Sequence, residues 1–274
     1  QVLGIPIGLY FANLWGWHSS FLMIVGLAVL IAITIVIKVK PIDKHLALQS
    51  DKSAFLHLWH AVSNKSYQTG FIATAFLSVG GFMLMPFSSA YLINNINITP
   101  QQLPMVFMFT GIASIIIMPL IGKLSDKIDK FMLFTAGSAL AIVMILIYTN
   151  LVPIPLWQVV LVNMVLFMGI MSRMIPATTL TMSIPDMKDR GAFMSVNASL
   201  QQMAGGIAAL CAGLIVTQKS STSPLENYGI LGIVVSVIIA VCCIFVYRVS
   251  VMVKKKQADV IQDIPKEELQ LSEV

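Results

Sequence analysis

The chain has 274 residues, of which 57% are hydrophobic and 11% are charged, with a formal net charge of +5 and a mean hydropathy of +0.87. Soluble domains carry about 25% charged residues, so this composition excludes a soluble globular domain and indicates an integral membrane protein. Several apolar runs approach the ~20 residues that an α-helix needs to cross a bilayer, without strand-like alternation, so we predict an all-α, polytopic membrane helix bundle.

The basic residues gather in alternate turns of this predicted bundle. Lysines lie at 38–65, 123–130 and 254–256, Lys188 and Arg190 share another turn, and the intervening turns contain only Lys219. By the positive-inside rule, the basic turns and the C-terminus are predicted to be cytoplasmic. This location of the charge excludes nucleic acid as a partner. We expect a multi-pass protein of the inner (cytoplasmic) cell membrane that contacts the lipid bilayer and is a monomer.

Residues 1–37 form two apolar segments. The chain begins inside an apolar run without an initiating Met, so we predict that it is the later part of a longer protein. The first segment contains Gly4, Pro6 and Gly8. Proline removes a helical hydrogen bond and glycines admit a neighbouring backbone, which predicts a bend or a close helix crossing. An external turn at Trp15–His18 leads into the second segment.

Residues 38–67 form a polar cytoplasmic connector. Apolar side chains at 55, 58, 59 and 62 follow an i, i+3, i+4, i+7 pattern, which predicts a short helix on the inner membrane surface. His57 and His60 have a spacing compatible with a metal, but we interpret them as the polar face of this helix. The three cysteines lie in apolar helices without ligand spacing. We therefore expect no bound metal and no cofactor.

Six further membrane helices form a predicted C-terminal six-helix bundle at residues 68–250. In the first of them, Gly80, Gly81 and Pro86 favour a bend, because helices bend sharply only at such residues. Residues 251–274 begin with lysines and then become acidic, which predicts a solvated cytoplasmic tail. The six helices are expected at 68–93, 101–121, 131–150, 156–182, 191–217 and 229–249.

The turn at residues 122–130 resembles a motif of the major facilitator superfamily. Cytoplasmic loops of that family carry Gly-x-Leu-x-Asp-Arg/Lys-x-Gly-Arg/Lys. Five residues match: Gly122, Leu124, Asp126, Lys127 and Lys130. Asp129 stands where the family has its second glycine. The resemblance implies that Asp126 pairs with basic residues or a helix N-terminus across a cytoplasmic gate. The alternative is a solvated turn that only obeys the positive-inside rule.

Other motifs resemble the drug:proton antiporter branch of that family, in particular its arabinose-efflux-permease-like members. Gly4-x-Pro6-x-Gly8 followed by Gly16-Trp17 is similar to the fifth helix and the turn after it, although His18 stands where that group usually has arginine. Further motifs of the group recur in order: Arg173-Met174-Ile175-Pro176, Arg190-Gly191, Met194-Ser195 and Gln201-Gln202. The resemblance implies that the chain runs from the end of helix 5 to helix 12.

Arg173 is the only ionisable residue well inside a predicted membrane helix. A cation at a helix centre costs roughly 2.5–3.5 kcal/mol on insertion scales, so a partner or a task is expected for it. Three roles are open for Arg173. It could face the central cavity and bind substrate, it could anchor a gate through an acid on another helix, or its side chain could snorkel to the inner membrane interface. Further candidates for polar contacts in a substrate cavity are Ser88, Ser89, Tyr91, Asn197 and Gln201.

Together these features predict a secondary active transporter that works by alternating access. The resemblance implies proton-coupled efflux of a small solute, sugar or drug-like, with Asp126, Lys127 and Arg190 at the cytoplasmic gate. All 12 acidic residues lie in loops, helix ends or the tail, so a proton-carrying carboxylate is expected in helices that precede this chain.

Two alternatives to proton-coupled efflux stay open. One is an importer or symporter of a small organic anion, which Arg173 would suit, and the other is a membrane sensor or scaffold without transport. An enzyme is not expected, because no paired acids, nucleophile triad or metal cluster is placed where its members could converge.

Overall fold

The computed structural model describes residues 4–38 and 54–262, and this part of the chain is almost entirely helical. Apart from one isolated bridge between Thr217 and Glu226, no β-structure occurs in the described residues. The helices are α1 Gly4–Trp15, α2 Trp17–Lys38, α3 Ala54–Ser63, α4 Lys65–Phe82, α5 Met85–Asn94, α6 Leu103–Lys127, α7 Lys130–Thr149, α8 Leu156–Met182, α9 Arg190–Ile215 and α10 Tyr228–Gln262.

The predicted all-α membrane bundle is confirmed. The described residues contain 7 spans that are long and apolar enough to cross a membrane, with α4 and α5 counted as one span. These spans coincide with the apolar runs of the sequence, because a helix satisfies its own backbone hydrogen bonds and needs only an apolar surface to enter lipid. The predicted short surface helix is present as α3, although the side chains at 54–57, including His57, lie outside the described ones.

The predicted bend after Gly80 and Gly81 is present as a two-residue break at Met83 and Leu84 between two helices, although both residues keep right-handed helical backbone angles. α4 ends at Phe82, and α5 begins at Met85 with Pro86 in its first turn. Proline has no N–H group to donate to the carbonyl of Phe82, so the helical ladder ends there and a new helix starts. The wall of the bundle at this point is therefore made of two helices that meet at an angle set by the break.

The last helix is longer than the sequence predicts. An end at residue 249 is expected from the apolar run, but α10 continues to Gln262, and the cytoplasmic tail at 251–274 stays a prediction. The remainder of the predicted tail lies outside the described residues. Two lysines of the extension, Lys254 and Lys256, pair with aspartates of two neighbouring turns. These tertiary contacts favour a helix beyond the apolar run, in a polar segment where hydropathy does not predict one.

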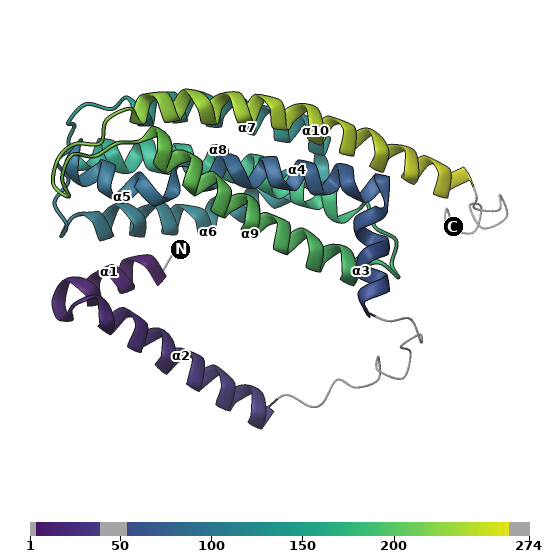
Figure 1. The fold of residues 1–274 in the computed structure, drawn as a ribbon, viewed down its shortest axis with the longest axis horizontal. Coiled ribbons are helices and arrows are strands. Elements are labelled where there is room, and N and C mark those ends of the chain that lie inside the picture. The colour runs from purple at the N-terminus through teal and green to yellow at the C-terminus, as the bar shows by residue number, and fades with distance from the viewer. Residues whose placement is uncertain (1–3, 39–53, 263–274) are drawn as a thin grey trace.

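Helices α4 to α10 pack into one bundle, with α7 on α8, α10 along both α4 and α7, α9 along α4, and α6 along α8 (Figure 1). Glycines permit the closest of these approaches: a Cβ atom at Gly137 of α7 would lie 2.7 Å from the backbone carbonyl carbon of Ser172 on α8. We refer to the end that carries the α6–α7 turn, the α8–α9 turn and the last turns of α10 as the basic end.

Helix α1 lies beside α6, and α2 packs against α1 and runs away from the bundle (Figure 1). Asn13 of α1 donates a hydrogen bond to the carbonyl of Pro100, just before α6 (3.3 Å). Ser20 of α2 donates to the carbonyl of Gly8 of α1 (2.6 Å), and this bond joins the two helices. Because residues 1–3 lie outside the described part, the bend predicted at Gly4, Pro6 and Gly8 stays a prediction.

Candidate functional site

A cavity of about 380 Å³ opens among α4, α5, α6, α8 and α9. Its walls are mainly apolar and include the rings of Phe82, Phe107 and Phe167. Its polar lining residues are all neutral: Ser78, Ser88, Ser89, Thr110, Tyr148, Asn163 and Gln201. No charged side chain belongs to this lining. Apolar walls with a few hydroxyl and amide groups are the usual composition of a site for a small organic molecule.

The polar groups of the cavity differ in how far they are already engaged. The hydroxyl groups of Ser88 and Tyr148 lie 2.8 Å apart and form a hydrogen bond across α5 and α7. Thr110 donates to the carbonyl of Val106 within its own helix (2.8 Å). The amide of Gln201 forms no hydrogen bond with another described residue. Gln201 can therefore offer both a donor and an acceptor to a solute.

The break between α4 and α5 forms one wall of the cavity. Gly80 and Gly81 precede the break, Leu84 and Met85 follow it, and all four line the cavity. A Cβ atom at Gly81 would meet no other atom within 4 Å, so the space beside this glycine is open. Interrupted helices beside a solute path are common in transporters.

The structure brings only some of the predicted cavity residues together. Ser88, Ser89 and Gln201 line the cavity, whereas Tyr91 and Asn197 do not. The hydroxyl of Tyr91 donates to the carbonyl of Leu151 (3.2 Å) and its ring stacks on Tyr228 with the centroids 4.1 Å apart. Asn197 is 5% exposed inside the bundle, and its Oδ1 has no hydrogen-bond partner among the described residues.

Arg173 lies inside the bundle and does not line the cavity. Its side chain is 2% exposed and its guanidinium carbon lies 5.8 Å from the centre of the Phe134 ring. No ion pair of the described residues includes it. The predicted acidic partner is therefore absent from the described part of the chain, and the guanidinium does not reach solvent as a snorkelling side chain would.

Four polar residues of the cavity were not predicted from the sequence: Ser78, Thr110, Tyr148 and Asn163. The position of Asn163 could have been predicted, because an amide in the middle of an apolar helix is unfavourable in lipid and usually faces the interior of a bundle. The sequence contains no such signal for Tyr148 and Thr110, because single residues of these types occur equally often at helix ends and in the contacts between packed helices.

The residues of the predicted gate motif lie at the basic end, where Asp126 and Lys127 are exposed and Gly122 and Lys130 are half-buried. Asp126 and Lys127 form no ion pair among the described residues, and a Cβ atom at Gly122 would meet nothing within 4 Å. Lys130 begins α7, and Arg190 begins α9 with an exposed side chain. The described residues therefore contain no closed gate, and the role of these residues across a gate stays a proposal.

Asp129, the residue that departs from the family motif, has two structural roles. Its Oδ1 accepts hydrogen bonds from the backbone N–H groups of Phe131 and Met132, both at 3.0 Å, and so caps the N-terminus of α7. Its Oδ2 lies 2.6 Å from the ammonium nitrogen of Lys254 on α10. An aspartate in this position thus joins the α6–α7 turn to the extension of α10, which glycine could not do.

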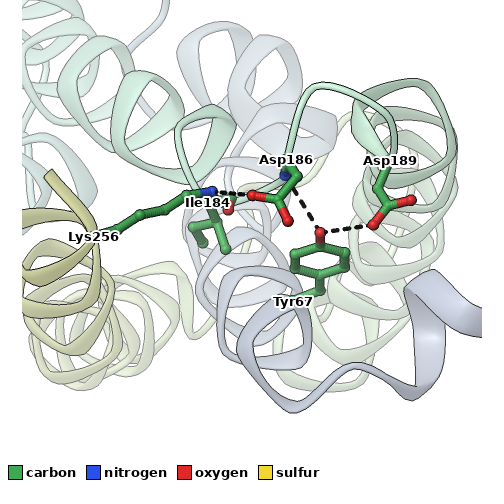
Figure 2. Close-up of polar contacts among 5 residues, drawn as sticks. All are labelled: Tyr67, Ile184, Asp186, Asp189 and Lys256. Atoms are coloured by element: carbon green, nitrogen blue, oxygen red, sulfur yellow. Dashed lines mark hydrogen bonds and ion pairs between the residues drawn. The ribbon is translucent and has the colours of Figure 1, made fainter. Parts of the chain in front are cut away.

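A second polar network joins the α8–α9 turn to α4 and α10 (Figure 2). The Lys256 ammonium donates to Asp186 Oδ1 (2.7 Å) and to the carbonyl of Ile184 (2.9 Å). The hydroxyl of Tyr67 donates to Asp189 Oδ2 (3.1 Å) and accepts from the backbone N–H of Asp186 (3.4 Å). The extension of α10 therefore connects two turns at the basic end through one ion pair each.

Both ion pairs of α10 lower the pKa of an aspartate. The hydrogen bond from Lys256 and its positive charge hold the pKa of Asp186 below its usual value, and Lys254 does the same for Asp129. A carboxyl group with a lowered pKa in the folded state contributes stability above its unfolded pKa of about 3.9, and loses that contribution as the pH falls through the folded value. Exposed pairs of this kind contribute about 0.2–1 kcal/mol each.

We therefore expect Asp186→Asn to lower the unfolding temperature slightly at neutral pH, and the difference from wild type to shrink as the pH falls below about 4. Thermal unfolding in detergent across this pH range checks the expectation. Asp259→Asn is the control, because Asp259 lies on the helix of Lys256 and forms no ion pair among the described residues. A difference that persists unchanged to about pH 3 would mean that Asp186 acts through another contact.

Comparisons with known proteins agree with this architecture. The family model described as Major Facilitator Superfamily matches residues 1–209. Among solved structures, the chain is similar to a Major Facilitator Superfamily transporter, FucP, in the outward conformation, with a TM-score of 0.58 and 17% sequence identity. That match covers 85% of this chain and 55% of the other, so this chain spans about half the length of FucP. No curated protein matched the sequence. Because the family model covers most of its length, the chain belongs to the Major Facilitator Superfamily, a family of membrane transporters.

Proposed function

We propose that the protein is a proton-coupled exporter of a small neutral or amphipathic solute, sugar or drug-like, which crosses the membrane by alternating access through the cavity between α4 and α9. The observation that carries the proposal is the lining of this cavity, which combines aromatic and apolar walls with hydroxyl and amide groups and no charge. Such a surface suits a solute with apolar faces and a few hydrogen-bonding groups.

The break between α4 and α5 supports alternating access. Alternating access requires that the two ends of a cavity open in turn, and a short helix that is separated by a break can tilt with little cost to the rest of the bundle. The glycines before the break and Pro86 after it provide the local freedom. We place the substrate against this wall, between the break and Gln201 of α9.

Proton coupling is inferred from the resemblance to drug:proton antiporters. Three aspartates at the basic end, Asp129, Asp186 and Asp189, bind lysines or Tyr67, and no acid of the described residues lines the cavity. The coupling carboxylate must then come from a part of the transporter outside these described residues. A proton that crosses 100 mV releases about 2.3 kcal/mol, which sustains a roughly fifty-fold solute gradient in a one-to-one exchange.

The basic end is proposed to face the cytoplasm, since it carries most of the lysines of the described residues. In that orientation Asp126, Lys127 and Arg190 are exposed where a second helical bundle would approach, and they remain the proposed gate. An importer of organic anions is the second candidate, favoured by Arg173, the one arginine or lysine that is buried among those whose exposure the structure describes.

The test uses the full-length protein in proteoliposomes, with the internal pH recorded by fluorescence while sugars and amphipathic drugs are added singly. We expect at least one neutral or amphipathic solute to drive a proton flux. Gln201→Ala is expected to raise the half-saturating concentration of that solute about two- to tenfold, the value of one hydrogen bond.

Gln202→Ala is the matched control, because Gln202 is the adjacent amide, is exposed, and does not line the cavity. Equal effects of the two substitutions on the half-saturating concentration would show that the cavity does not lie on the transport path. If no solute drives a proton flux, proton-coupled export is contradicted, and flux driven only by organic acids would favour the importer.

A further inference from the structure

Arg173 has unused hydrogen-bonding capacity in a place where water cannot supply it. Among the arginines and lysines whose exposure the structure describes, it alone is buried, at 2% exposure. Its Nε and Nη2 atoms have no hydrogen-bond partner among the described residues. A buried cation without a counter-charge is unfavourable because it has lost its hydration and gained nothing equivalent. The ring of Phe134, 5.8 Å away, offsets only part of that loss.

The neighbours of Arg173 do not provide the missing partner. The nearby thiol of Cys242 donates to the carbonyl of Ala73 (3.9 Å) and is a weak acceptor. The aspartates that form contacts in the structure are engaged at the basic end by Lys254, Lys256 and Tyr67. An anion that satisfies Arg173 would therefore have to come from outside the described residues.

The guanidinium lies directly behind one wall of the cavity. A Cβ atom built at Gly80 would lie 3.4 Å from Nη1 of Arg173 and 3.3 Å from Cγ1 of Ile239, and Gly80 itself lines the cavity. On α8, Ile170 and Met174 also line the cavity. At 3.6 residues per turn, Arg173 lies about 60° around the helix from Ile170, at the flank of the lining face.

This geometry leaves a passage for the side chain. Glycine at position 80 has no side chain between the guanidinium and the cavity, and the neighbouring Gly81 faces open space. α4 ends at Phe82, so its last turn is the part of the helix with the fewest continuing hydrogen bonds. The long side chain of arginine can then turn from the bundle interior toward the cavity without any movement of α8.

We propose that Arg173 is a concealed anion-binding group of the cavity, which turns past Gly80 to pair with the carboxylate of a bound amphipathic acid or with an inorganic monoanion. The planar guanidinium fork matches a carboxylate in a bidentate pair, and the neutral walls accommodate an apolar body beside it. The inference rests on the proposed use of this cavity by a solute, and it adds anionic solutes to those that the lining alone would favour.

Binding to the purified full-length protein tests the proposal. Benzoate and benzamide are the probes, since they have the same ring and nearly the same shape and differ in charge. Isothermal titration in chloride-free buffer is expected to give about tenfold or more tighter binding of benzoate to wild type, as expected for a charge-assisted hydrogen bond. Arg173→Met should remove this preference while leaving benzamide binding, and Arg173→Lys should keep part of it.

Gly80→Ala provides an independent variant that keeps the charge. Its methyl group would narrow the passage beside Nη1, so the preference for benzoate should fall, whereas Gly206→Ala should leave it unchanged because a Cβ atom there meets nothing within 4 Å. Chloride that competes with benzoate in wild type but not in Arg173→Met would support the site and show that it also accepts an inorganic anion.

Equal affinities of wild type for benzoate and benzamide would overturn the proposal, as would a preference for benzoate that survives in Arg173→Met. If Arg173→Met does not fold, an undiminished preference in Gly80→Ala overturns it instead. These failures are separate from a failure of the proposed function, because proton flux driven by a neutral solute in wild type does not depend on binding benzoate.

Discussion

Gly137→Val is expected to abolish the yield of folded protein, because α7 and α8 touch backbone to backbone at this glycine. A Cβ atom at position 137 would lie 2.7 Å from both the carbonyl carbon and the Cβ of Ser172, and 2.8 Å from the backbone nitrogen of Arg173. Backbone atoms cannot move aside as a flexible side chain can, so the two helices would have to separate along their shared interface.

The smaller substitution Gly137→Ala allows the effect to be measured. Overpacking typically costs about 1–3 kcal/mol, and the loss of close helix contact in a membrane bundle adds to it. We expect a clear fall in the unfolding temperature, measured in detergent by fluorescence or by light scattering. Gly206→Ala is the matched control: it also lies inside a long helix, its Cβ atom would meet nothing within 4 Å, and alanine favours helix over glycine by about 1 kcal/mol.

A fall in stability for Gly137→Ala and none for Gly206→Ala would locate the effect in the α7–α8 contact. Equal stabilities of the two variants would contradict the close approach of these helices. Because Arg173 follows Ser172 on α8, the same experiment reports on the interface that holds the buried guanidinium in position.

Gly81→Leu is expected to lower transport by roughly tenfold or more without unfolding the protein. Gly81 lines the cavity and a Cβ atom there meets no atom within 4 Å, so the leucine side chain has space only in the cavity itself. It would occupy part of a volume of about 380 Å³ beside the break between α4 and α5. A tenfold loss corresponds to about 1.4 kcal/mol of solute binding.

The measurement is solute-driven proton flux in proteoliposomes, alongside thermal unfolding of the same variant. Gly206→Leu is the control, since it makes the same chemical change in open space away from the cavity lining. Full transport by Gly81→Leu would show that solute does not occupy this cavity. Loss of transport in both variants would point to a general effect of leucine on the bundle instead of a block at the site.

Hydropathy predicted the existence and approximate position of every membrane helix in the described residues, because an apolar run of about 20 residues has no other stable fate in a bilayer. The local chemistry of Gly80, Gly81 and Pro86 likewise predicted where one helix is interrupted. Both are properties of a short stretch of chain, and neither needs a neighbour to be known. The motif resemblance led to the correct superfamily for the same reason, since its residues are contiguous in sequence.

The tertiary structure alone decided which polar residues share a cavity, where α10 ends and what surrounds Arg173. Ser88, Tyr148 and Gln201 come from three different helices, and their meeting depends on how those helices pack and rotate. Lys254 and Asp129 are far apart in the chain, yet they form an ion pair in the part of α10 that continues past its apolar run. Hydrophobic burial in a membrane determines that a helix forms. Contacts between helices, which glycines such as Gly137 allow to be close, determine which face of the helix points into the bundle.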